Sequence, residues 1–150
     1  MQTAIVGIGC FWKETEFKKL KGVISTEVGY CGGNTNKTDY KKVCSGNCNS
    51  AEVVKVNFDE KILSYENFLR FFFSIHDPTT LNSQGPDIGR QYRSVIYYLN
   101  DFQKERALKS KEKFQPIFKN RIVTEITKAD IFYKAEEYHQ QYIQKRVSVD

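Results

Sequence analysis

The sequence predicts an α+β protein, a two-layer α/β sandwich whose mixed sheet contains a ferredoxin-like split βαβ core. Three observations predict this fold. Short segments rich in β-branched residues alternate along the chain with segments of helical period. Clusters of Gly, Pro and Asn separate these segments, as expected for turns. The length of 150 residues suits one domain, which we expect to span residues 1–150.

The N-terminal part predicts a strand, a helix and a second strand. Gln2–Gly7 is short, apolar and rich in β-branched residues, which is typical of a buried strand. Apolar residues recur with helical spacing from Phe11 to about Leu20, and Gly22 can end this helix. Val23–Gly29 predicts the next strand.

The segment Tyr30–Asn49 predicts a loop because Gly, Asn and Ser are frequent in it. A loop of about twenty residues inside a compact domain is usually functional or disordered. This one contains Tyr40 and three of the four cysteines, Cys31, Cys44 and Cys48. We therefore interpret it as part of a functional site.

The rest of the chain alternates strands and helices. Hydrophobic residues alternate in the first of these strands and follow a helical stripe in the first helix. The predicted elements are a strand at Glu52–Phe58, a helix capped by Ser64 and reaching about Ile75, a loop at His76–Gln91, a strand at Arg93–Leu99, a helix capped by Asn100 and reaching about Phe114, a strand at Ile122–Lys128 and a short amphipathic helix at Ala135–Lys145.

Composition narrows the classes of protein. The net charge is +5, but the basic residues are spread along the chain, so we expect no nucleic-acid partner. No apolar run approaches the roughly 20 residues that span a bilayer, and no secretory signal is visible, so we expect a cytoplasmic protein without a membrane partner. In a reducing compartment, four cysteines indicate metal binding or thiol chemistry rather than disulfides. We also expect a monomer.

Cys10 lies where the first strand is expected to lead into a helix, and Phe11 and the chain's only tryptophan, Trp12, follow it. Unpaired backbone N–H groups at a helix start favour the thiolate, which lowers the pKa of a cysteine there. A buried cysteine of purely structural role is the alternative. The aromatic pair favours a nucleophile beside an apolar box, with a substrate that carries a small apolar group next to an atom open to thiolate attack.

The order of several blocks resembles a known family. These blocks are "GCFWKETEF", "GVISTEVGYCGG", "TDYKKVCSG", "AEVVKVNFD", "HDPTTLN", "QGPDIGRQYRSVIYY" and "AEEYHQQY". The chain resembles peptide methionine sulfoxide reductase of the A type from about Ala4 to Tyr142. The resemblance implies a thiol-dependent oxidoreductase that reduces the S epimer of methionine sulfoxide, free or in proteins, and so repairs oxidised proteins under oxidative stress. It implies no cofactor.

The resemblance also implies a role for seven residues. Cys10 would attack the sulfoxide sulfur, Phe11 and Trp12 would hold the substrate methyl group, Glu52 would donate a proton to the sulfoxide oxygen, Tyr40 and Tyr92 would hydrogen-bond that oxygen, and Asp87 would bind the substrate backbone or order the site. These roles are chemically reasonable, because a sulfoxide oxygen leaves poorly until it is protonated. A carboxylic acid beside apolar walls has a raised pKa and can supply that proton.

Recycling is where the sequence departs from the family. Attack leaves Cys10 as a sulfenic acid, which condenses with a second thiol before a thioredoxin-like reductant restores it. Many members carry recycling cysteines in a C-terminal tail, but "YIQKRVSVD" has none. We predict Cys48 as the resolving thiol and Cys31 as the next candidate. Direct regeneration by an external thiol remains the alternative.

Two other functions are open. A zinc-binding module could use Cys31, Cys44 and Cys48 with His76 or Cys10, although the C-x12-C-x3-C spacing lacks the paired C-x2-C of structural zinc sites. A catalytically inactive methionine-binding protein of the same fold is the second alternative. The presence of the expected residue type at every carried-over position argues against it.

Overall fold

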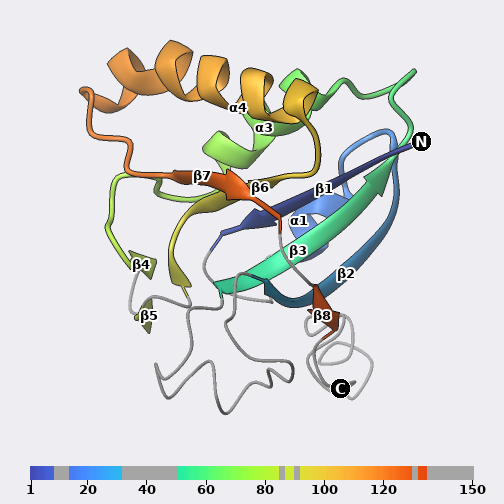
Figure 1. Cartoon of the computed structure of the whole chain (residues 1–150), viewed down its shortest axis with the longest axis horizontal. Helices are drawn as coiled ribbons and strands as arrows, with labels where there is room; N and C mark the ends of the chain where they lie inside the picture. Colours follow the sequence, from blue (N-terminus) through green and yellow to red (C-terminus); the bar gives the residue numbers. More distant parts are fainter. Residues whose placement is uncertain (9–13, 32–50, 85–86, 90–91, 130–131, 135–150) are drawn as a thin grey trace.

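A computed structural model of the chain describes residues 1–8, 14–31, 51–84, 87–89, 92–129 and 132–134 (Figure 1). The strands are β1 (Gln2–Gly7), β2 (Val23–Cys31), β3 (Ala51–Phe58), β4 (Ser83–Gln84), β5 (Asp87–Ile88), β6 (Val95–Tyr98), β7 (Glu125–Lys128) and β8 (Tyr133–Lys134). The helices are α1 (Glu14–Lys18), α3 (Tyr65–Ser74) and α4 (Asp101–Phe114), followed by the 3-10 turn η3 (Gln115–Phe118).

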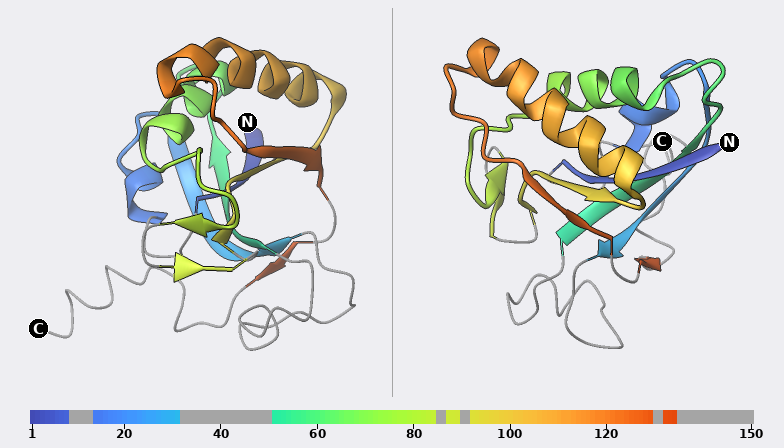
Figure 2. Two further views of the ribbon diagram at one scale, coloured as in Figure 1. Left: turned by 90° about the vertical axis from the view of Figure 1, so that its left-hand side faces the viewer. Right: turned by 45° about the horizontal axis from the view of Figure 1, so that its top comes forward.

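The main sheet has the order β7-β6-β1-β3-β2-β8. Strand β3 pairs antiparallel with β1 on one side and with β2 on the other, so β1 and β2 run parallel with β3 between them. This is the predicted split βαβ unit. The sheet is mixed because β6 pairs antiparallel with β1 but parallel with β7. Helices α1, α3 and α4 lie on one face, so the predicted fold class is confirmed (Figures 1 and 2).

Two hydrophobic clusters lie on opposite faces of the sheet. On β3, Val54, Val56 and Phe58 point toward the helices and pack with Phe68 of α3, as the alternation predicts. The face turned away from the helices carries a smaller group, here called the back-face cluster. It consists of Ile5, Cys31, Ala51, Val53, Val95 and Tyr97. The sheet therefore buries residues on both faces near the ends of β2 and β3.

The helix caps follow the sequence prediction. The side chains of Ser64 and Asn100 each accept a hydrogen bond from the backbone N–H three residues later, at 3.1 and 2.9 Å. The stripe of α3 places Phe68 and Phe72 in the core with no exposed surface. Phe68 stacks on Phe17 of α1 with 5.4 Å between ring centroids, which ties both helices to the same face.

Some boundaries differ from the prediction. Strand β2 continues to Cys31, because Tyr30 and Cys31 pair with Glu52 and Ala51 of β3. The predicted loop therefore begins two residues too early. The last predicted strand begins three residues too early, since β7 starts at Glu125.

Three short elements were not predicted. These are the β4–β5 hairpin inside the expected loop at His76–Gln91, the turn η3 and strand β8. Two-residue strands are too short to show alternation, so their sequences carry no signal. The start of the helix expected from Phe11 and the helix expected at Ala135–Lys145 lie outside the described residues. None of the helices among the described residues is long and apolar enough to cross a bilayer.

Candidate active site

Glu52 lies at one end of the sheet, where β1 and β2 end and β3 begins. It is the second residue of β3 and pairs with Tyr30 of β2. Only 4% of its surface is exposed. Because side chains alternate along a strand, its carboxylate lies on the helix side of the sheet, as does the side chain of Val54. The structure thus holds a buried carboxylate on the same sheet face as α1.

Gly7, at the end of β1, lets the backbone next to β6 and the backbone of Glu52 in β3 approach it closely. A Cβ atom on Gly7 would lie 3.2 Å from the carbonyl oxygen of Glu52 and 3.1 Å from that of Arg93. It would also lie 2.6 Å from Cγ1 of Val95, which is closer than real Cβ contacts. Only glycine permits this approach of backbones at the end of β1.

Tyr92 directly precedes this point of contact. Its backbone N–H donates to the carbonyl of Gly89 at 3.1 Å, and the residue is half-buried. The backbones of Arg93 and Glu52 both lie close to Gly7. The structure therefore brings the segments that carry Glu52 and Tyr92 to the same end of β1.

Cys31 occupies a different environment from Glu52. It has no exposed surface and belongs to the back-face cluster, with Ala51 and Tyr97. Its partner across the β2–β3 ladder is Ala51, whereas Glu52 pairs with Tyr30. Consecutive residues of a strand point to opposite faces, so the Cys31 and Glu52 side chains lie on opposite faces of the sheet.

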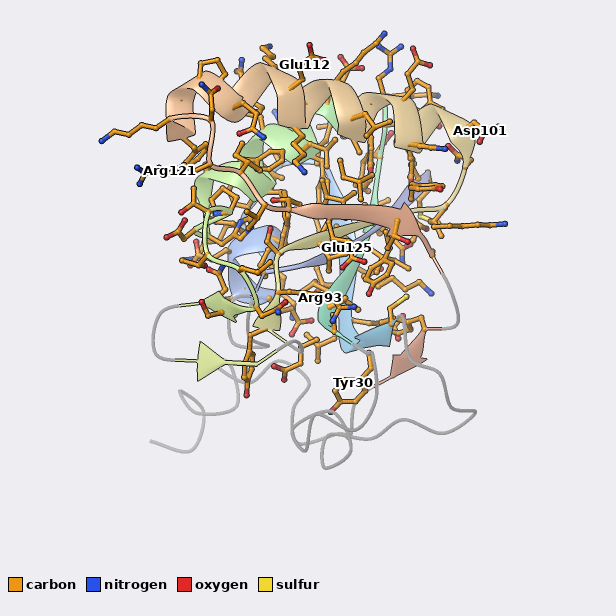
Figure 3. All side chains as sticks on the ribbon, turned by 60° about the vertical axis from the view of Figure 1, so that its left-hand side comes forward. Tyr30, Arg93, Asp101, Glu112, Arg121 and Glu125 are labelled. Carbon is orange, nitrogen blue, oxygen red and sulfur yellow. The ribbon has the colours of Figure 1, made fainter. Side chains whose placement is uncertain are left out.

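A chain of polar groups crosses the back face, with Arg93 and Tyr97 buried and Glu125 exposed to solvent. Arg93 donates from Nε to Oε2 of Glu125 at 2.8 Å and from Nη2 to the Tyr97 hydroxyl at 3.2 Å. The Tyr97 hydroxyl donates to the carbonyl of Cys31 at 3.1 Å. Burial raises the pKa of Tyr97, so its hydroxyl keeps the proton that it donates. Arg93 and Glu125 lie one above the other in Figure 3.

His76 belongs to a second buried network. Its Nδ1 lies 2.7 Å from the carbonyl of Phe72, so Nδ1 carries the hydrogen and donates it. Its Nε2 then accepts from the Ser94 hydroxyl at 2.7 Å, and Ser94 lies 2.8 Å from the Thr124 hydroxyl. Both ring nitrogens are therefore engaged, which argues against His76 as a zinc ligand. Within the described ranges, no three His, Cys, Asp or Glu residues are grouped to hold a metal.

Comparison with known proteins decides the family. The family model described as peptide methionine sulfoxide reductase matches residues 2–149. The chain belongs to the peptide methionine sulfoxide reductase family. A relative from Pelagibacter ubique, named peptide methionine sulfoxide reductase MsrA, is 56% identical over 147 residues, which are 97% of this chain and 100% of that protein. The resemblance found in the sequence is thereby confirmed.

Solved structures of methionine sulfoxide reductases share the fold. Reduced Mxr1 from Saccharomyces cerevisiae has a TM-score of 0.91 and 39% identity, over 97% of this chain and 86% of that one. The structure of Mxr1 in complex with Trx2 has a TM-score of 0.66 and 28% identity, over 94% of this chain and 84% of that one. The zinc-binding alternative gains no support from these relatives.

The structure describes only some of the residues expected to serve the reductase. It places Glu52 and Tyr92 at one end of β1, and it places Asp87 at the start of the β4–β5 hairpin's second strand. The remaining expected site residues lie outside the described residues; they are Cys10, Phe11, Trp12, Tyr40 and Cys48.

Arg93 and Tyr97 are the residues that the sequence prediction missed. Both lie in the block "QYRSVIYY", in which the sequence predicts a strand that begins at Arg93. The signal in the sequence was the Arg at the start of this apolar run. Arg is rarely buried unless it is paired, so its place there predicts a buried polar partner.

Proposed function

We propose that this chain reduces the S epimer of methionine sulfoxide, free or within proteins, with Cys10 as nucleophile and Glu52 as proton donor. Family membership makes it a peptide methionine sulfoxide reductase, an oxidoreductase that acts on a sulfur group. The observation that carries the assignment of Glu52 is its burial beside Gly7, three residues before Cys10. Three residues of extended chain span at most about 11 Å, which supports assigning Cys10 and Glu52 to one site.

The reaction moves an oxygen atom and two electrons. The Cys10 thiolate attacks the sulfoxide sulfur while the Glu52 carboxyl protonates the sulfoxide oxygen. The oxygen then becomes bonded to the Cys10 sulfur as the hydroxyl of a sulfenic acid while its bond to the substrate sulfur breaks. The bond between the two sulfur atoms breaks as well, and its electron pair stays on the methionine sulfur. The methionine sulfur is reduced by two electrons and the Cys10 sulfur is oxidised by two.

The residues around the sulfur explain the choice of epimer. We assign the substrate methyl group to Phe11 and Trp12, and the hydrogen bonds to the oxygen to Tyr40 and Tyr92. Asp87 binds the substrate backbone or orders the site. Because methyl and oxygen have separate sites and the substrate chain must point away from the Cys10 thiolate, only one configuration at sulfur presents its oxygen to the acid.

Turnover of separated epimers tests this function. With dithiothreitol as reductant, we expect methionine to form from the S epimer and not from the R epimer, because the methyl and oxygen sites are not interchangeable. Chromatography of free methionine measures the product. Equal rates with both epimers, or no turnover of either, would contradict the proposal.

We propose Cys48 as the thiol that resolves the Cys10 sulfenic acid. Cys48 is four residues before Glu52, which limits the distance between their Cα atoms to about 14 Å. Cys31, the second candidate, is fully buried on the opposite face of the sheet from Glu52. A disulfide requires Cα atoms within about 7 Å, so Cys31 would have to leave the back-face cluster.

One equivalent of methionine sulfoxide without reductant distinguishes the recycling routes. We expect two thiols to be lost for each methionine formed, and a peptide that links Cys10 to Cys48 in the mass spectrum. The Cys31→Ala variant is the matched control and should lose two thiols as well. A stable Cys10 sulfenic acid trapped by dimedone in the parent protein would contradict a resolving role of Cys48 and favour direct regeneration.

A thioredoxin-like protein is the proposed reductant. The structure of the yeast relative Mxr1 in complex with Trx2 supports such a partner. Thioredoxins have reduction potentials low enough to open most exposed disulfides. A cytoplasmic location fits this chemistry, because a reducing compartment keeps the Cys10 thiol available for each turnover.

A further inference from the structure

The polar chain on the back face joins the segment that carries Tyr92 to the end of β2, whose residue Tyr30 pairs with Glu52. Arg93 directly follows Tyr92, and Cys31 is the last residue of β2 before residues 32–50, which carry Tyr40 and Cys48. The Tyr97 hydroxyl bonds to both Arg93 Nη2 and the Cys31 carbonyl, at 3.2 and 3.1 Å. The Tyr97 hydroxyl therefore connects the backbone of Cys31 in β2 to the side chain of Arg93.

This connection crosses the sheet rather than following a ladder. Tyr97 lies in β6 and Cys31 in β2, and strands β1 and β3 run between them. Adjacent strands are about 4.8 Å apart, so no backbone pairing links β6 to β2 directly. The Tyr97 ring, with 1% of its surface exposed, provides that link across the back-face cluster.

The hydrogen bonds of Arg93 hold its guanidinium in a fixed position. Its side chain is 6% exposed, whereas that of Glu125 is 44% exposed, so the guanidinium is the buried partner of the ion pair. A buried cation requires its partners, and the planar guanidinium presents its donors in a rigid fork. Bonds from Nε to Glu125 and from Nη2 to Tyr97 therefore fix the plane of the group and with it the backbone beside Tyr92.

We propose that Arg93 and Tyr97 are positioning residues, which set the segment that carries Tyr92 relative to the end of β2, where Tyr30 pairs with Glu52. Tyr92 and Glu52 are both assigned to the sulfoxide oxygen, so their mutual position decides how well that oxygen is held and protonated. This inference rests on the proposed function and deepens it. Neither Arg93 nor Tyr97 is assigned contact with the substrate.

The Tyr97→Phe variant tests the role, with Tyr98→Phe as the matched control. Tyr98 is the next residue of β6; it is half-buried, and its ring faces Lys104 instead of the polar chain. We expect Tyr97→Phe to lower the single-turnover rate of methionine formation at saturating S epimer by about tenfold, because small misplacements of catalytic groups are costly. The concentration of substrate at half-maximal rate should stay about the same, and Tyr98→Phe should match the parent.

A second variant separates positioning from stability. Arg93→Lys keeps the charge but cannot bond to Glu125 and Tyr97 with the same fork, so it should also slow the reductive step. Because both residues act through one connection, the double variant should be no slower than the slower single variant. Urea unfolding of each variant measures stability independently of rate.

The outcomes are distinguishable. If the parent is active and both variants lose stability but keep the parental single-turnover rate, the pair only supports the fold and the positioning role is overturned. If the parent reduces neither epimer, the proposed function fails, and the positioning role fails with it. If Tyr97→Phe does not fold, the single-turnover rate of Arg93→Lys decides between the first two outcomes.

Discussion

Replacing Cys10 with serine should abolish the reduction of methionine sulfoxide and leave the fold intact. The result is expected because the reaction needs an anionic nucleophile, and a serine alkoxide is far less available at neutral pH than a cysteine thiolate. Sulfur also accepts the oxygen as a sulfenic acid, which a serine hydroxyl cannot do. Methionine release with dithiothreitol measures the effect, and circular dichroism checks the fold.

Cys44→Ser is the matched control for this experiment. Cys44 lies in the same chain segment as the resolving candidates but has no proposed role in the reductive step. Its single-turnover rate should therefore equal that of the parent. Residual activity of Cys10→Ser within about tenfold of the parent would remove Cys10 from the mechanism, since loss of a covalent nucleophile costs far more.

Glu52→Gln should slow the first reductive step by about 10²–10⁴-fold, the usual contribution of a general acid. The amide keeps the size and hydrogen-bonding capacity of the side chain but cannot transfer a proton. Because Glu52 is 4% exposed, bulk water cannot readily replace it as the proton source. Rapid-quench measurement of methionine formation, without reductant, isolates this step from recycling.

Glu14→Gln offers a buried carboxylate as the control. Glu14 is 1% exposed and accepts a hydrogen bond from the Thr26 hydroxyl at 2.6 Å. Glu14 is also four residues after Cys10, so it tests whether any buried carboxylate close to the nucleophile along the chain can act as the acid. Because its carboxylate is already held by Thr26, Glu14→Gln should change the free energy of unfolding and slow the chemical step far less than Glu52→Gln does. An unchanged rate in Glu52→Gln would show that another group supplies the proton.

The local elements could be predicted because their signals lie in adjacent residues. Ser64 caps α3 through its own side chain, and the alternation of Val54, Val56 and Phe58 shows which face of β3 is buried. The end of β2 could not be predicted in this way. Tyr30 and Cys31 follow a Gly and precede a Gly-rich run, and only their pairing with β3 keeps them in a strand.

In the candidate site, too, features set by neighbouring residues could be predicted, whereas those set by long-range contacts could not. Motif blocks indicated Glu52 and Tyr92, because residue type and order are enough to recognise a family. They could not show that Cys31 is buried on the other face of the sheet, since that depends on the register of β2 against β3. Nor could they show that the Tyr97 hydroxyl donates to the Cys31 carbonyl, because that contact joins residues 66 positions apart.

The central claim is that the sulfoxide oxygen is transferred to Cys10 from one epimer only. A single turnover without reductant tests it most directly, in the Cys48→Ser variant and with dimedone present to trap the sulfenic acid. We expect one methionine per chain from the S epimer, none from the R epimer, and a dimedone adduct on Cys10 alone. Methionine formed without an adduct on Cys10, or formed equally from both epimers, would contradict it.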